Sequence, residues 1–115
     1  MKHKKLEGLA KILRIFIDEA DYWEGEPLHE AIVKRLHAED IAGATVFRGL
    51  MGYGAPSRMH HTGWLGTPTE LPIMVTVVDT EEKLKKILPM LDEMVGEGLI
   101  VLSDAEVIKY TLPIE

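Results

Sequence analysis

The sequence predicts an α+β fold of the ferredoxin-like type, a βαββαβ sandwich in which two helices cover one face of an antiparallel sheet. Four short runs rich in β-branched and aromatic residues predict the strands, at 12–17, 41–49, 71–78 and 99–102. Apolar stripes with helical spacing follow the first and third runs. The chain has 115 residues, so we expect residues 1–115 to form a single domain, with an extra C-terminal strand at 105–112.

The composition excludes several classes of function. The formal net charge of −6 disfavours nucleic-acid binding, which needs a clustered basic surface. The chain has no cysteine, which removes disulfides, thiolate catalysis and thiolate metal sites. No segment has the roughly 20 apolar residues of a membrane-spanning helix, and the first residues do not form a signal peptide. We therefore expect a cytoplasmic protein without membrane insertion or a nucleic-acid partner.

The first predicted strand, at 12–17, has apolar residues on both faces, which is typical of a central strand. An acidic connector follows at 18–26. It contains five carboxylates, at Asp18, Glu19, Asp21, Glu24 and Glu26. Their spacing matches no metal-binding loop, so we interpret them as a solvated run of charge.

The first helix is predicted to begin near Pro27, because proline is tolerated in the first turn. Its apolar stripe is formed by Leu28, Ile32, Val33 and Leu36. Glu30 and Lys34 are expected to form an i,i+4 ion pair, and Gly43 lies just beyond the helix end. His29 and His37 are interpreted as surface residues, since they are too far apart to bind one metal ion.

Glycines follow the second strand, at positions 49, 52 and 54, and lead into a polar loop at about 55–70. Glycine lets a ligand approach the backbone closely. A loop of this length is more often functional or disordered than a simple connector. Two interpretations stay open, a ligand-responsive loop and the mobile tip of a hairpin. We expect the loop to be mobile in the absence of a partner or ligand.

The second helix is predicted to follow an N-terminal cap at Asp79–Glu82. Pro89 interrupts its apolar stripe and predicts a kink or a division into two pieces. Gly96-Glu97-Gly98 ends the helix. Ser103-Asp104 is interpreted as a turn between strands at 99–102 and 105–112. Because both helices are expected on one face of the sheet, the apolar residues of the other face need a different cover. Self-association is the simplest one.

The sequence resembles the PII-type signalling proteins and, more closely, the PII-like family DUF190, also called UPF0166. The resemblance spans nearly the whole chain. It depends on Arg-Gly-x-x-Gly-Tyr-Gly-Ala at 48–55, Glu70-Leu71-Pro72 before the third strand, and the ending Val107-Ile108-Lys109-Tyr110. It implies a homotrimer whose sheets face inward and which binds adenine nucleotides in clefts between subunits.

The resemblance also implies a set of nucleotide-binding residues. Two glycine turns would approach the nucleotide through backbone atoms, and Lys109 stands where PII proteins place a phosphate-binding residue on the last strand. The candidate site comprises Arg48, Gly49, Gly52, Tyr53, Gly54, Gly96, Glu97, Gly98 and Lys109.

Two departures from the PII pattern bear on the ligand. Leu99 stands where PII proteins have a lysine after the glycine turn, and Thr111 stands where they have an arginine. Both missing groups would hold outer phosphates. We therefore expect AMP to be favoured, with ADP and ATP as further ligands, unless Arg48 or Arg58 supplies substitute charge.

Three hypotheses of function follow. The first is a non-enzymatic, nucleotide-responsive signalling protein that contacts a protein partner through loop 55–70. The second is a metal-binding trimer of similar fold that uses His60 and His61 with His3 or an acidic residue. The third is an enzyme, for which the sequence offers no set of nucleophile, base and acid.

Overall fold

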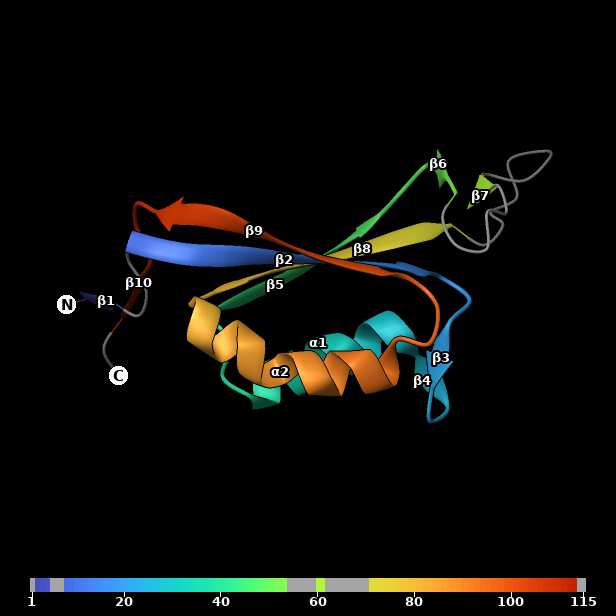
Figure 1. The fold of residues 1–115 in the computed structure, drawn as a ribbon, viewed down its shortest axis with the longest axis horizontal. Coiled ribbons are helices and arrows are strands. Elements are labelled where there is room, and N and C mark those ends of the chain that lie inside the picture. The colour runs from blue at the N-terminus through green and yellow to red at the C-terminus, as the bar shows by residue number, and fades with distance from the viewer. Residues whose placement is uncertain (1, 5–7, 54–59, 62–70, 114–115) are drawn as a thin grey trace.

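The computed structural model describes residues 2–4, 8–53, 60–61 and 71–113. Its central sheet is antiparallel, with strands in the order β5–β8–β2–β9. Their bounds are Gly8–Asp18 (β2), Gly43–Arg48 (β5), Pro72–Asp79 (β8) and Leu99–Val107 (β9). Helices α1 (Leu28–Ala38) and α2 (Glu81–Met94) lie side by side on one face of this sheet (Figure 1). The predicted α+β, ferredoxin-like fold is confirmed.

Three pairs of short strands lie outside the central sheet. Strand β1 (Lys2–Lys4) pairs with β10 (Thr111–Pro113), β3 (Tyr22–Trp23) with β4 (Glu26–Pro27), and β6 (Met51–Gly52) with β7 (His60–His61). The β1–β10 pair lies at the opposite end of the sheet from β6 (Figure 1). Apart from the backbone pairing of β7, the predicted loop 55–70 lies outside the described residues.

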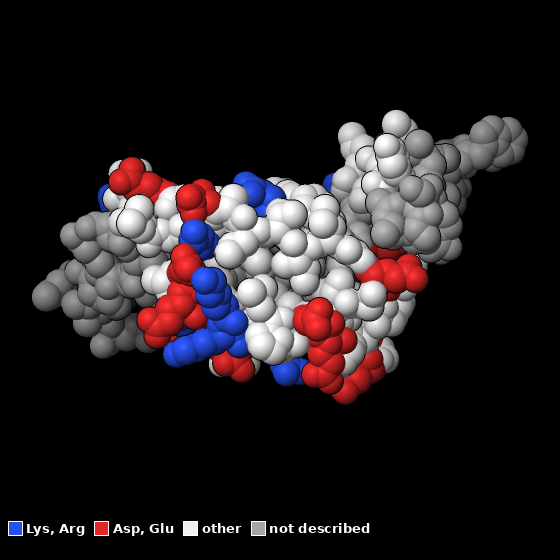
Figure 2. Space-filling view, viewed as in Figure 1, with Lys and Arg blue, Asp and Glu red and all other residues white. Residues whose placement is uncertain are grey.

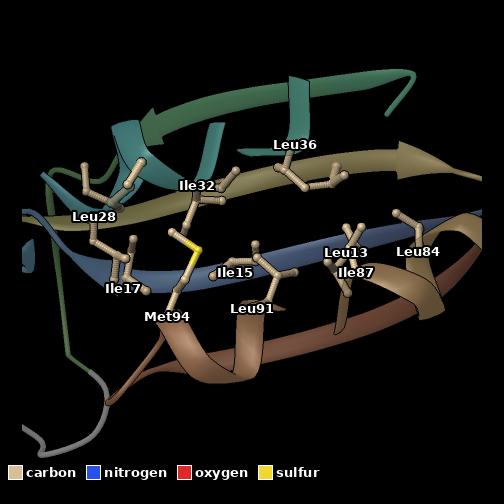
Figure 3. Close-up of a cluster of buried hydrophobic side chains, with 14 residues drawn as sticks. Leu13, Ile15, Ile17, Leu28, Ile32, Leu36, Leu84, Ile87, Leu91 and Met94 are labelled. Atoms are coloured by element: carbon tan, nitrogen blue, oxygen red, sulfur yellow. The ribbon is translucent and has the colours of Figure 1, made fainter. Parts of the chain in front are cut away.

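The hydrophobic core lies between the sheet and the helices. Alternate residues of β2 and β8 face the helices and are buried, as the period of two in a strand requires. Figure 3 shows Leu13, Ile15 and Ile17 of β2 meeting the helices. The stripes of both helices supply the other wall, with Leu28, Ile32 and Leu36 from α1 and Leu84, Ile87, Leu91 and Met94 from α2. The predicted first three strands and both helical stripes are confirmed.

The predicted turn at Ser103–Asp104 is wrong. Strand β9 continues through both residues and pairs with β2 from Leu99, opposite Phe16, to Val107, opposite Gly8. The side chains that favour a turn make contacts between strands instead. Asp104 pairs with Lys11, and Ser103 accepts a hydrogen bond from Arg14. The predicted strand at 105–112 is therefore divided between β9 and β10.

The predicted cap and break of the second helix also need correction. The N-cap is Thr80, whose Oγ1 accepts a hydrogen bond from the backbone N–H of Lys83 at 3.3 Å. Asp79 is the buried last residue of β8. Pro89 does not divide the helix, which is continuous over Glu81–Met94; a kink there stays a prediction.

The first helix ends at Ala38 in a Schellman motif, and Gly43, predicted to lie just beyond the helix, begins β5. Asp40 has a φ of 58°, and its N–H donates to His37, while the N–H of Ile41 donates to Leu36. The close ion-pair partner of Lys34 is Glu26 rather than the predicted Glu30, although the charge of Glu30 also acts favourably on Lys34. Nζ of Lys34 lies 3.0 Å from Oε1 of Glu26, because β4 brings that carboxylate beside the helix.

Candidate functional site

A cleft of about 570 Å³ opens at one end of the sheet. The antiparallel order brings the ends of β2 and β5 to the same edge as the beginnings of β8 and β9. Phe16 pairs with Leu99 and Phe47 pairs with Met74, and all four residues line the cleft. The volume is in the range of small-molecule sites, roughly 300–1,000 Å³.

The first glycine turn follows β5 and packs closely against Pro72. The N–H of Gly49 donates to the carbonyl of Pro72 at 2.7 Å. A Cβ at Gly49 would lie 2.7 Å from Cγ of Pro72, closer than carbon atoms can approach. A Cβ at Gly52 would lie 3.4 Å from the same atom. Glycine at position 49 therefore lets the chain turn into the wall of the cleft.

The second glycine turn joins α2 to β9 and brings Glu97 and Gly98 to the cleft. A Cβ at Gly98 would lie 2.5 Å from the carbonyl oxygen of Phe16 and 3.0 Å from Cγ1 of Val95. Position 98 therefore has no room for a side chain. Gly96 differs, because a Cβ there would meet no atom within 4 Å.

Large apolar side chains line much of the cleft and remain accessible. Phe16, Phe47 and Tyr53 are 37%, 50% and 70% exposed, and Met51 and Leu99 are also exposed. Aromatic rings exposed in a cleft are suited to contact the flat face of a nucleobase.

The charged residues of the cleft are mostly acidic. Asp18, Asp21 and Glu97 line it, and Arg48 is the one basic side chain among the described lining residues. Arg48 forms an ion pair with Glu19 in the connector after β2. Asp21 also shapes this wall, since its Oδ2 accepts a hydrogen bond from the N–H of Asp18 at 3.0 Å. Elsewhere on the surface, Figure 2 shows acidic and basic side chains alternating in a column. Among the ion pairs outside the cleft, Nζ of Lys11 lies 3.4 Å from Oε1 of Glu81 in the first turn of α2.

The structure brings six of the nine predicted residues to this cleft. They are Arg48, Gly49, Gly52, Tyr53, Glu97 and Gly98. Gly96 lies in the second turn but does not line the cleft, and Gly54 lies outside the described residues.

Lys109 is not in the cleft of its own chain. It follows the far end of β9, where Val107 pairs with Gly8, and it lies between β9 and β10. The prediction that Lys109 belongs to the last strand is therefore wrong. Its separation from the cleft follows from the continuity of β9.

Phe16, Phe47, Asp18 and Asp21 line the cleft but were not predicted to do so. A partial signal was present, since both phenylalanines of the chain lie near the end of a predicted strand. Their meeting depends on the pairing of β2, β8 and β5, which the sequence alone does not specify.

Two features of the described residues bear on metal binding and membrane insertion. No group of three His, Cys, Asp or Glu side chains suited to a metal ion occurs among the described residues. Only the backbone of His3, His60 and His61 is described. The hypothesis that these histidines bind a metal ion therefore stays a prediction. No helix in the described ranges is long and apolar enough to cross a membrane.

Comparison with known proteins identifies the family. The DUF190 family model, described as "Uncharacterized ACR, COG1993", matches residues 10–107. The chain belongs to the DUF190 family. The DUF190 chain is 39% identical over 101 residues to the UPF0166 protein MJ1524 of Methanocaldococcus jannaschii, covering 87% of this chain and 93% of that protein. It is 38% identical over 100 residues to a UPF0166 protein of Aquifex aeolicus, covering 85% and 92% of the two chains.

A solved structure has the same fold as this DUF190 protein. It is CPII, a nitrogen regulatory PII-like protein from Thiomonas intermedia K12, bound to ADP, AMP and bicarbonate. The TM-score is 0.68 with 19% sequence identity, and the match covers 88% of this chain and 90% of CPII. The fold of the DUF190 chain is therefore PII-like.

Proposed function

We propose that this DUF190 protein is a non-enzymatic regulatory protein that binds an adenine nucleotide in the cleft, with AMP favoured over ATP. The observation that carries this proposal is the meeting of two glycine turns around an apolar, aromatic cleft. Gly49 and Gly98 let backbone atoms form its walls, and Phe16 and Phe47 offer faces for a base. The ligands of CPII, ADP and AMP, support an adenine nucleotide.

The preference for AMP is supported by the charges around the cleft. Asp18, Asp21 and Glu97 outnumber Arg48 among the described lining residues. Each added phosphate brings negative charge toward these carboxylates, so repulsion disfavours ATP more than AMP. Leu99 offers no charge-assisted hydrogen bond, and each such bond contributes about 1.5–3 kcal/mol.

We further propose a homotrimer whose subunits meet through the face of the sheet opposite the helices. Phe16, Phe47 and Leu99 are exposed on that side, and α1 and α2 cover the other side (Figure 1). In such an assembly, Lys109 of a neighbouring subunit would complete the cleft. The clefts would then be intersubunit sites.

Loop 55–70 would report the ligand state to a regulated protein in the cytoplasm, since His60 pairs with Gly52 beside the cleft. The described lining residues include no serine or threonine hydroxyl beside a histidine or lysine base, the pairing that most often activates a nucleophile.

Calorimetric titration with AMP, ADP and ATP, with and without magnesium, tests the proposal. We expect AMP to bind at least as tightly as ATP. Much tighter binding of ATP would contradict the preference, and no binding of any of the three would contradict the nucleotide site. Light scattering tests the trimer separately, and a monomer at micromolar concentration would contradict it.

A further inference from the structure

A row of polar side chains crosses the face of the sheet opposite the helices, which we call the open face. Thr45 of β5 lies directly opposite Thr76 of β8, and Thr76 lies directly opposite Arg14 of β2. These residues alternate with buried ones such as Leu13, Ile15 and Val75, so they face away from the helices. Ser103 of β9 extends the row, since Nη1 of Arg14 donates to its Oγ at 3.2 Å.

The surroundings of this row are apolar. Ile12 and Phe16 flank Arg14 on the same face of β2, and Met74 and Val78 flank Thr76 on β8. The hydrogen bond from Arg14 to Ser103 is exposed in the single chain, but a guanidinium in such a setting needs further partners once another molecule covers this face, because exclusion of water around it is costly unless its charge is balanced.

The row offers hydrogen-bond donors and a positive charge. Arg14 is partly buried and has five N–H groups, of which one nitrogen is engaged by Ser103. The Ser103 oxygen already accepts this bond, so its own hydrogen can be donated elsewhere. Oγ1 of Thr76 is enclosed and has no hydrogen-bond partner among the described residues.

No carboxylate lies beside Arg14 on this face of the four described strands. The strand residues that share the face include one acid, Asp18, at the end of β2 and four positions along the chain from Arg14. Asp18 also takes part in the connector, where its Oδ1 accepts a hydrogen bond from Ala20 at 2.9 Å. The charge of Arg14 is therefore not balanced by a neighbouring side chain of its own sheet.

We propose that Arg14, with the hydroxyl groups of Thr76 and Ser103, forms a binding site for a small oxyanion of the phosphate, sulfate or carboxylate class. The planar guanidinium binds two oxygens of such an anion at once. Residues directly opposite one another in antiparallel strands have Cβ atoms about 4.5–5.5 Å apart, so the Thr76 side chain lies beside that of Arg14, and rotation about its Cα–Cβ bond would turn the enclosed hydroxyl toward an anion held by Arg14.

The site is separate from the cleft and does not require a nucleotide. Binding to Arg14 stands without the proposed function, but its consequence for assembly rests on the proposed homotrimer. If subunits meet through the open face, they bury the Arg14 charge, and the oxyanion would compensate that charge in the interface.

Thermal unfolding with increasing sulfate or phosphate, against chloride at equal ionic strength, tests the site. A ligand that binds only the folded state raises the melting temperature in a saturable way. Sulfate and phosphate also stabilise proteins generally by exclusion from the surface, but that effect is not saturable and is shared by all variants. We expect a saturable rise in the wild-type protein.

The variants assign the rise to its residues. Arg14→Met should abolish the saturable rise in melting temperature. Thr76→Val should raise the apparent dissociation constant for the anion about tenfold, as loss of one charge-assisted hydrogen bond predicts. Arg35→Met, which changes an exposed arginine of α1, should leave the rise unchanged. Arg14→Lys, which keeps the charge but not the planar group, replaces Arg14→Met if that variant does not fold, and should also weaken binding.

Three outcomes would overturn the proposal. They are no saturable rise in the wild-type protein, a rise that persists in Arg14→Met, and a rise that Arg48→Met removes, since the anion would then occupy the cleft. Calorimetry with AMP separates the two proposals. If AMP binds but sulfate gives no saturable rise in melting temperature, the oxyanion site alone is rejected. If sulfate gives that rise but AMP does not bind, the nucleotide site alone is rejected.

Discussion

Arg48, at the end of β5, forms an ion pair with Glu19 in the connector after β2. The Arg48 side chain is 58% exposed and that of Glu19 is 25% exposed, so the pair lies at the rim of the cleft. Because Arg48 is the one basic lining residue among those described, this pair reduces the positive charge available to a phosphate group.

Glu19→Gln is therefore expected to raise nucleotide affinity, and more for ATP than for AMP. A partly exposed ion pair contributes about 0–1 kcal/mol, so the gain should be at most about fivefold. Calorimetry with both nucleotides measures it. Glu82→Gln, on an exposed residue in the first turn of α2, is the matched control and should change neither affinity. Equal gains for AMP and ATP would show that Glu19 does not act on the phosphates.

The two glycines of the second turn should respond differently to alanine. Gly98→Ala places a Cβ 2.5 Å from the carbonyl oxygen of Phe16, so β2 and the turn must move apart. We expect a loss of about 1–3 kcal/mol in the free energy of unfolding, measured by urea denaturation. Gly96→Ala meets no atom within 4 Å and should change that free energy by less than about 0.5 kcal/mol. Equal effects would contradict the close approach at position 98.

Asp79 is the one buried charged residue among those described, and it joins three elements. Its Oδ2 accepts the N–H of Ala42 at 2.8 Å, its Oδ1 accepts the N–H of Thr80 at 2.6 Å, and Nζ of Lys83 lies 3.7 Å from Oδ2. Asp79→Asn replaces one carboxylate oxygen by an NH₂ group, which would face the backbone N–H of either Ala42 or Thr80. The expected cost is about 1–3 kcal/mol of unfolding free energy. Asp92→Asn, on an exposed position of α2, is the control and should cost little.

The contact between Lys11 and Asp104 predicts a dependence of stability on pH. The hydrogen bond and charge of Lys11 lower the pKa of Asp104 below its ordinary value. A carboxyl whose pKa is lowered by folding stabilises the protein above its ordinary pKa and loses this contribution as the pH falls through the lowered value. Melting temperatures should therefore be slightly higher in the wild type than in Asp104→Asn near pH 7. The two should converge in strong acid, and a difference that grows on acidification would contradict the contact.

The sequence predicts the helices, and the succession of strands and helices along the chain, because apolar periodicity reflects burial directly. It fails at Ser103 and Asp104, whose local preference is for a turn. Their partners Arg14 and Lys11 lie about ninety positions away in the chain. The same limit applies to the cleft. Glycine spacing marks the two turns, but the meeting of Phe16 with Phe47 depends on strand register.

The continuity of β9 leads to a prediction about Lys109. Leu99 lines the cleft at one end of β9, and Lys109 follows Val107 at the other end. The eight residue steps from Leu99 to Val107, each about 3.3 Å, place Lys109 roughly 25 Å from the cleft of its own chain. If Lys109 binds the phosphate, it must come from another subunit. Lys109→Met and Arg48→Met should then each weaken AMP binding when present in all subunits.

Unfolding and refolding an equal mixture of the two variants should restore some sites. A cleft that takes Arg48 from a Lys109→Met subunit and Lys109 from an Arg48→Met subunit has both native residues. Random assembly gives about one such cleft in four. Calorimetry of the mixture should therefore show a fraction of sites with wild-type affinity, whereas each variant refolded alone should show none. If the mixture binds no better than the two variants measured separately, Lys109 does not reach the cleft across a subunit boundary.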